Sequence, residues 1–274
     1  MFAAHIIVVL SLMVGSVRPS SKLILTMPKM PMLCREGRQV GMIVVGGDVG
    51  AGKSTHARLL VKYLNDVCRR AMYRHVKTFH LAHILLVLVL LIRYRSRVIL
   101  RACKYYSPIR ILYVHDRRLL TKLFTFISLL NLIGLLLRSF TQLHLAKAFG
   151  RVIVVEDHII GYTNDMAYFF LTLKGDVGMK AKHLWLLGFN YLLKDIKDWN
   201  AVIVFFYADL DVLRERWWRR GTPEEFLEYI LAGRVAFRIL SNLIEVHYIS
   251  TSRPIPEVFR DVVSKTSRIV CYYH

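Results

Sequence analysis

The stretch Gly47-Asp48-Val49-Gly50-Ala51-Gly52-Lys53-Ser54 matches the pattern G-x-x-x-x-G-K-[ST] of a phosphate-binding loop. Its glycines let the backbone curl so that successive N–H groups point at phosphate oxygens, on a helix N-terminus that favours anions. Lys53 is placed to neutralise the β- and γ-phosphates, and the Ser54 hydroxyl to complete the Mg²⁺ shell. The stretch therefore predicts binding of ATP and Mg²⁺, with nucleotide contacts from Gly47, Asp48, Val49, Gly50, Ala51, Gly52, Lys53, Ser54 and Thr55.

The sequence on either side of this loop favours the same interpretation. Residues 40–45 form a short run rich in β-branched side chains, typical of a strand buried in a parallel sheet. After the loop, apolar residues from Ala57 to Leu64 recur at helical spacing. The alternative is a glycine turn that binds no nucleotide, and it requires neither the strand nor the helix.

The composition of the chain is basic and apolar. Its 274 residues include 39 Lys and Arg against 19 Asp and Glu, a formal net charge of +20, and 55% of them are hydrophobic. Such a charge predicts attraction to polyanions: nucleotide phosphates, nucleic acid or an anionic membrane surface. The four cysteines, at 34, 68, 103 and 271, are scattered, which argues against a zinc site and a disulfide framework and favours a cytoplasmic protein.

The first 38 residues differ from the rest. Residues 1–16 are mostly apolar and carry no Lys or Arg, and residues 18–38 contain three prolines, as in an irregular linker. We expect a short anchor, or an extension from a mis-set start codon, rather than a signal peptide. One domain over residues 39–274 then follows, with an apolar helical insertion at about 81–137.

Short apolar runs recur along that domain with helical stretches between them. This rhythm predicts an α/β, three-layer P-loop NTPase fold, in which a parallel five-stranded sheet has helices on both faces. Ligands of such sheets bind beyond the carboxyl ends of the strands, so polar residues directly after each run are candidates for function. The expected strands are residues 40–45, 109–114, 152–155, 201–207 and 245–249.

One acidic and one basic residue, each just after one of these runs, are candidates for function. Asp157, in Glu156-Asp157-His158, lies where a carboxylate orients Mg²⁺ through water or receives a hydroxyl proton; the alternative is a helix N-cap. Arg117, in the segment 115–118, is placed to bind a second phosphate; the alternative is a surface charge cluster.

The segment 207–221 has the features of a lid. Four of its arginines fall within seven residues, just before Gly221. In phosphoryl transfer such arginines stabilise charge on the moving phosphoryl group while excluding water. A solvated basic helix is the alternative. The four arginines are Arg214, Arg216, Arg219 and Arg220.

Taken together, these features resemble the thymidylate kinase group of nucleoside monophosphate kinases. The resemblance extends from Val40 to about Val263, and its order and spacing agree apart from one insertion. It rests on the phosphate loop and on the segments 112–117, 152–158, 167–168, 209–221, 234–237 and 248–258.

The resemblance implies a reaction, ATP + acceptor monophosphate → ADP + acceptor diphosphate, with thymidine monophosphate as the acceptor. It also implies roles. Lys53, Asp157, Arg216 and Arg220 would be catalytic, Ser54 and Asp157 would lie at the Mg²⁺, and Arg117 and Tyr168 would bind the acceptor. Two motifs depart from the family: the acceptor segment reads Val76-Lys77-Thr78-Phe79-His80-Leu81-Ala82-His83, and Asp-Arg-Tyr reads Asp157-His158-Ile159.

The insertion supplies the remaining alternatives. The runs 81–92 and 123–137 are uncharged, yet each is shorter than the 18 apolar residues expected of a spanning helix. We expect hydrophobic helices that dip into a membrane surface, or helices that pack on the sheet or in a homodimer. The chain is thus a soluble nucleotide kinase, a membrane-associated kinase with a lipid-linked acceptor, or a non-catalytic NTPase that binds nucleic acid. The last ranks lowest because no nucleic-acid-binding module is recognisable.

Overall fold

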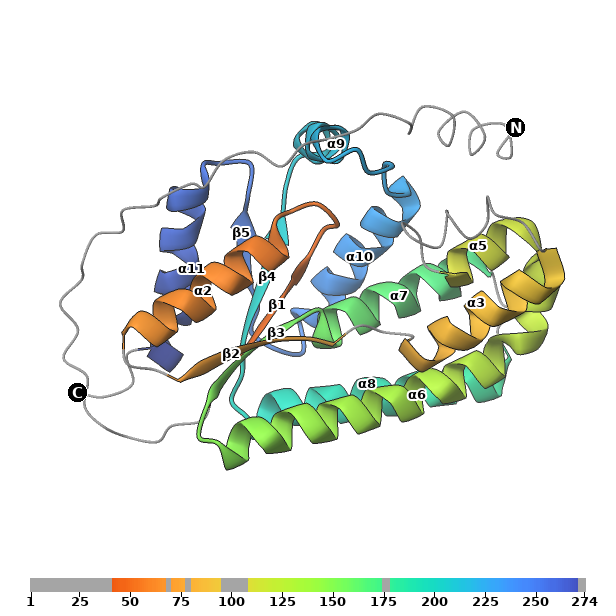
Figure 1. Cartoon of the computed structure of the whole chain (residues 1–274), viewed down its shortest axis with the longest axis horizontal. Coiled ribbons are helices and arrows are strands. Elements are labelled where there is room, and N and C mark those ends of the chain that lie inside the picture. Colours follow the sequence, from red (N-terminus) through yellow and green to blue (C-terminus); the bar gives the residue numbers. More distant parts are fainter. Residues whose placement is uncertain (1–40, 68–69, 77–79, 95–107, 174–177, 271–274) are drawn as a thin grey trace.

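The computed structural model describes residues 41–67, 70–76, 80–94, 108–173 and 178–270. The N-terminal segment 1–38 and most of the basic stretch 93–104 lie outside the described residues, so the anchor expected there stays a prediction. Figure 1 shows an α/β arrangement in which a central twisted sheet has helices around it.

All strands of the sheet are parallel, in the order β2-β3-β1-β4-β5. Because parallel neighbours need crossover connections, the helices lie on both faces of this sheet. The predicted three-layer α/β fold is therefore confirmed. The strands are β1 (Met42–Gly47), β2 (Ala71–His75), β3 (Val152–Glu156), β4 (Val202–Tyr207) and β5 (His247–Ser250).

Alternate residues of β1 enter two separate hydrophobic cores. Met42 and Val44 face one core, and Ile43 and Val45 face the other, as the two-residue period of a strand requires. The second core is covered by α2 (Lys53–Asp66), α9 (Leu210–Arg219) and α11 (Ile255–Val270). The first is covered by α3 (His80–Tyr94), α5 (Pro108–His115), α6 (Arg117–Ala148), α7 (His158–Thr172), α8 (Met179–Asp198) and α10 (Leu227–Leu240).

One predicted strand is wrong: residues 109–114 belong to helix α5. Pro108 stands at the first helical position, where its fixed φ suits a helix and its missing N–H costs nothing. Ile109 and Leu112 are fully buried, three residues apart, whereas His115 is exposed. The strand that completes the sheet is β2, an edge strand whose residues are mostly half-buried, so its sequence carries no apolar run.

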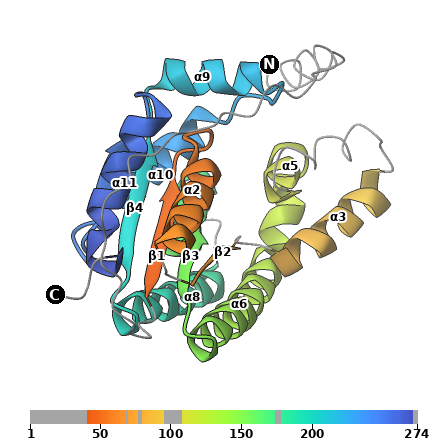
Figure 2. The same ribbon diagram turned by 60° about the vertical axis from the view of Figure 1, so that its left-hand side comes forward.

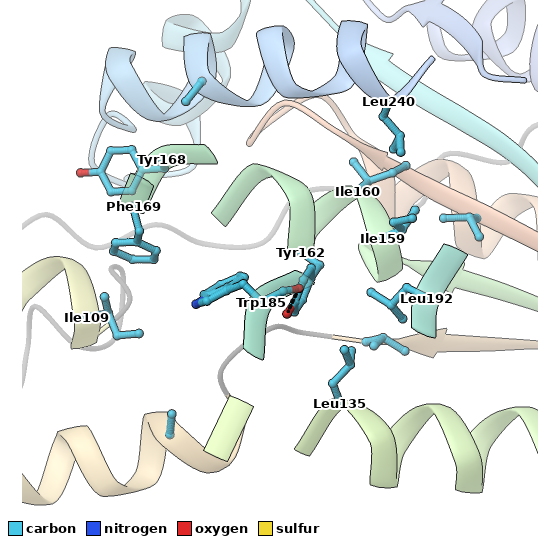
Figure 3. Close-up of a cluster of buried hydrophobic side chains, with 14 of the residues drawn as sticks. Ile109, Leu135, Ile159, Ile160, Tyr162, Tyr168, Phe169, Trp185, Leu192 and Leu240 are labelled. Atoms are coloured by element: carbon cyan, nitrogen blue, oxygen red, sulfur yellow. Dashed lines mark hydrogen bonds between the residues drawn. The ribbon is translucent and has the colours of Figure 1, made fainter. Parts of the chain in front are cut away.

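The larger core is built around aromatic side chains (Figure 3). Trp185 on α8 is 1% exposed, and its carbonyl accepts a hydrogen bond of 2.9 Å from the Tyr162 hydroxyl on α7. Its indole Nε1 donates to Ser128 Oγ on α6 at 3.0 Å. The insertion helix α6 is thereby fixed to α8 by packing and by hydrogen bonds on its inner side.

Candidate active site

The phosphate loop joins β1 to α2, and its glycines have conformations that other residues rarely adopt. Gly47, Gly50 and Gly52 have φ values of 134°, 91° and 83°. A Cβ on Gly47 would collide with the Phe206 carbonyl of β4, and one on Gly50 would lie 2.6 Å from Trp217 Nε1. The sequence thus specifies a narrow cradle directly before the N-terminus of α2, as anion binding requires.

Lys53 begins α2 and folds back over this loop. Its Nζ donates hydrogen bonds of 3.1 Å to the carbonyls of Gly47 and Asp48. The ammonium group is therefore held at the mouth of the cradle, where a triphosphate would meet it. Thr55, the last predicted nucleotide contact, is exposed on the first turn of α2.

A buried carboxylate faces Ser54. Glu156, the last residue of β3, is 3% exposed, and its Oε1 accepts a hydrogen bond of 2.7 Å from Ser54 Oγ. Its other oxygen accepts a hydrogen bond from the Tyr73 hydroxyl of β2, and burial raises the pKa of Tyr73. The sequence analysis assigned no role to Glu156, although it is the carboxylate that contacts the loop serine.

Asp157 lies one residue further on and contacts His75, the last residue of β2. Asp157 Oδ2 and His75 Nε2 are 2.7 Å apart, and both side chains are about a quarter to a third exposed. One ligand atom from each of His75, Glu156 and Asp157 lies within 4.8 Å of the others. The two carboxylates and the Ser54 hydroxyl are hard oxygen ligands, and they fit a Mg²⁺ ion bound chiefly through water and phosphate oxygens.

The arginine-rich helix α9 contacts the loop from the other side. Arg216 Nη1 donates to Thr251 Oγ1 at 3.1 Å and reaches the Gly50 carbonyl at 3.5 Å. Partial burial, followed by the charge of Arg220, lowers the pKa of Arg216. Trp217 is 4% exposed beside the loop, whereas Arg220, the other predicted catalytic arginine, is exposed at the end of α9.

Arg234 on α10 is a loop contact that the sequence analysis named only as part of a matching segment. Its Nε and Nη2 donate to Asp48 Oδ2 at 3.1 and 2.5 Å, and Nη2 also donates to the Ala208 carbonyl at 2.6 Å. The Asp48 side chain is 2% exposed. No local pattern could have shown this pair, because its residues are 186 positions apart.

The two predicted acceptor residues lie towards the other end of α7. Tyr168 is buried, with its ring 5.3 Å from the Tyr229 ring, and burial raises its pKa to about 12. Arg110 of α5 stacks 3.5 Å from the Tyr229 ring centroid and forms an ion pair with Glu225. Arg117 instead donates to the Leu173 carbonyl at 3.2 Å. This contact lies at the C-terminal end of α7, whereas Asp157 precedes the N-terminal end of the same helix.

The parallel sheet, the loop after its central strand and the helix on that loop define the three-layer α/β fold of P-loop NTPases. No protein-family model and no curated protein matches the sequence. Thymidylate kinase from Candida albicans is similar over 84% of this chain and 92% of its own, with TM-score 0.49 and 15% identity. Deoxyadenosine kinase from M. mycoides, solved with bound dCTP, is similar over 82% of this chain and 98% of its own, with TM-score 0.45 and 14% identity.

Proposed function

We propose that the protein transfers the γ-phosphoryl group of ATP to a phosphorylated acceptor, a nucleoside monophosphate such as thymidine monophosphate. The observation that carries this proposal is the convergence on one loop of Lys53, of Glu156 through Ser54, and of Arg216. A cation, a carboxylate-supported hydroxyl and a lid arginine around a phosphate cradle are the parts that phosphoryl transfer uses.

Each group has a distinct task in this reaction. Lys53 would exchange the Gly47 and Asp48 carbonyls for phosphate oxygens, and the loop N–H groups would bind the β-phosphate. A Mg²⁺ ion held near Ser54, Glu156 and Asp157 would neutralise charge between the β- and γ-phosphates. An acceptor phosphate oxygen forms the new bond to phosphorus in line with the breaking β–γ bridge, and ADP leaves. Arg216, and Arg220 after closure of α9, would stabilise the charge on the moving group.

The test is ADP formation by the full chain with ATP, Mg²⁺ and a panel of nucleoside monophosphates. We expect acceptor-dependent ADP with thymidine monophosphate, and its loss in Lys53→Ala. Lys62→Ala is the matched control, because Lys62 is an exposed lysine on the same helix. If ATP binds but no monophosphate stimulates its turnover, the nucleotide-kinase proposal is wrong.

A second candidate, a kinase for a lipid-linked acceptor, is favoured by one observation. Although its uncharged run is short, helix α6 is long and apolar enough over Arg117–Thr141 to cross a membrane by length and composition. Its most apolar 18-residue window has a mean hydropathy of 1.9, and 39% of that window is buried. This helix begins at Arg117, one of the two residues predicted to bind the acceptor. Its exposed apolar side chains would suit an acceptor that stays in a membrane. ADP formation stimulated by phosphorylated lipid extract, and by no nucleotide, would select this candidate.

A further inference from the structure

Helix α6 has an apolar stripe that the fold leaves exposed. The stripe consists of side chains spaced three or four residues apart, which therefore lie on one face of the helix. The opposite face is buried against α8 and the core, through residues such as Phe124, Ile127 and Leu135. The stripe residues Phe126, Leu129, Ile133, Leu137 and Phe140 are 41–59% exposed.

Helix α3 adds a second stripe of the same kind. Ile84, Leu88 and Ile92, four residues apart, are 59%, 50% and 76% exposed. The two helices pack against each other, and Figure 2 shows them together on the side of the molecule away from α11. Exposed apolar side chains gathered on two packed helices mark an interaction site.

The charges on these helices indicate what the surface binds. Neither α3 nor α6 contains an Asp or Glu, whereas Arg117, Arg118 and Lys122 are exposed at the start of α6. Asp116, just before α6, caps the helix by accepting a hydrogen bond of 2.9 Å from the Leu119 N–H. Apolar side chains with several exposed cations beside them match an anionic lipid surface. A contact with a second copy about a two-fold axis parallel to α6 would place the same cations together, which is unfavourable.

The fold also decides how α6 would meet the bilayer. Its outer stripe is exposed, but its inner face packs on α8 and α3. Its end at Ala148 leads within four residues to β3, an inner strand of the sheet. A crossing helix would need lipid around it and would draw the polar ends of the sheet into hydrocarbon. We propose that the protein docks on anionic membranes through the exposed faces of α3 and α6, with α6 lying in the plane of the interface. This proposal does not depend on the identity of the acceptor.

The experiment is flotation of the full chain with vesicles of phosphatidylcholine, with and without about 30% phosphatidylglycerol. We expect binding to the anionic vesicles, weakened at least tenfold in Phe126→Ser/Ile133→Ser/Leu137→Ser. The matched control is Leu231→Ser/Val235→Ser/Ile239→Ser, which removes three residues of 48–61% exposure from α10 and should leave binding unchanged. Circular dichroism of each variant shows whether it is folded. A second variant, Arg118→Glu/Lys122→Glu, keeps the apolar stripe and should also weaken binding to anionic vesicles.

Three results would overturn the proposal. In the first, the wild-type chain does not float with either vesicle. In the second, the folded α6 variant floats as well as the wild type, which would show that another part of the chain binds the membrane. In the third, the wild type is a dimer in solution that the α6 variant converts to a monomer without any change in vesicle binding, which would identify the stripe as a subunit interface.

Discussion

Arg234 on α10 and Asp48 in the phosphate loop form an ion pair in which two guanidinium nitrogens donate to one carboxylate oxygen. Asp48 is buried, whereas a third of the Arg234 side chain is exposed. The pair joins the loop to a helix packed on the opposite side of the sheet from α2. The loop conformation therefore depends on α10 as well as on its own glycines.

Removal of Arg234 should destabilise the protein more than removal of another arginine from the same helix. Arg234→Ala leaves a buried carboxylate without its partner, and we expect a loss of about 3 kcal/mol in the free energy of unfolding. Arg238→Ala is the control, because Arg238 is exposed on α10 and should change stability by less than about 0.5 kcal/mol. Urea unfolding measures both values. Equal effects of the two variants would show that the pair contributes little.

Gly50→Ala should impair the nucleotide cradle. At a φ of 91°, an alanine would destabilise the folded backbone by about 1–2 kcal/mol relative to glycine. Its Cβ would also clash with Trp217 Nε1, which lies 2.6 Å from that position. We expect lower stability and weaker ATP binding, measured by thermal unfolding and titration calorimetry. Gly178→Ala is the matched control, because its φ is −59° and a Cβ there would meet nothing within 4 Å. Wild-type ATP affinity in Gly50→Ala would contradict the strain argument.

Glu156→Gln should raise the Mg²⁺ concentration needed for nucleotide binding more than Asp157→Asn does. The Glu156 carboxylate is the one that contacts Ser54, so its charge lies closest to the loop end of the site. We expect the required Mg²⁺ concentration to rise roughly tenfold in Glu156→Gln and by less in Asp157→Asn. Calorimetric titration of ADP at several Mg²⁺ concentrations measures this without turnover. The reverse order of effects would assign the metal role to Asp157, as the sequence analysis predicted.

The parts of the fold that could be predicted are those whose signals are local. The loop, the strand before it and the helix after it form one continuous motif. β4 and the first four residues of β3 are apolar runs. The run 109–114 has a similar composition, but Pro108 and the packing of Ile109 and Leu112 make it a helix. β2 was missed as a separate strand because an edge strand needs no continuous apolar run.

The parts of the site that could not be predicted depend on pairing between distant segments. Glu156 meets Ser54 because β3 lies beside β1, and His75 meets Asp157 because β2 is paired with β3 in a register that puts His75 opposite Glu156. Neither the sheet order nor this register can be derived from the runs themselves. Arg117, which the family resemblance assigned to the acceptor, begins α6 and donates to the Leu173 carbonyl, and its acceptor role stays a prediction.

His158 should make the protein less stable in mild acid. It is fully buried at the start of α7, neither ring nitrogen has a hydrogen-bond partner among the described residues, and burial lowers its pKa from 6.5 to about 3. Below pH 6.5 the unfolded chain therefore takes up a proton that the folded chain excludes. The neutral imidazole's contribution is complete above pH 6.5 and is lost progressively as the pH falls towards 3, with about 2 kcal/mol lost between pH 7 and pH 5.

The substitution His158→Leu tests this effect. Leucine removes both unpaired nitrogens and the titration, so we expect a shallower decline of unfolding free energy between pH 7 and pH 5, measured by urea unfolding at each pH. His183→Leu, which replaces an exposed histidine on α8, should keep the wild-type slope. His56 is also buried, and burial, followed by the charge of Arg216, lowers its pKa to about 4, so part of the acid sensitivity should remain. If His158→Leu retains the full slope, His158 is already protonated or solvated in the folded protein.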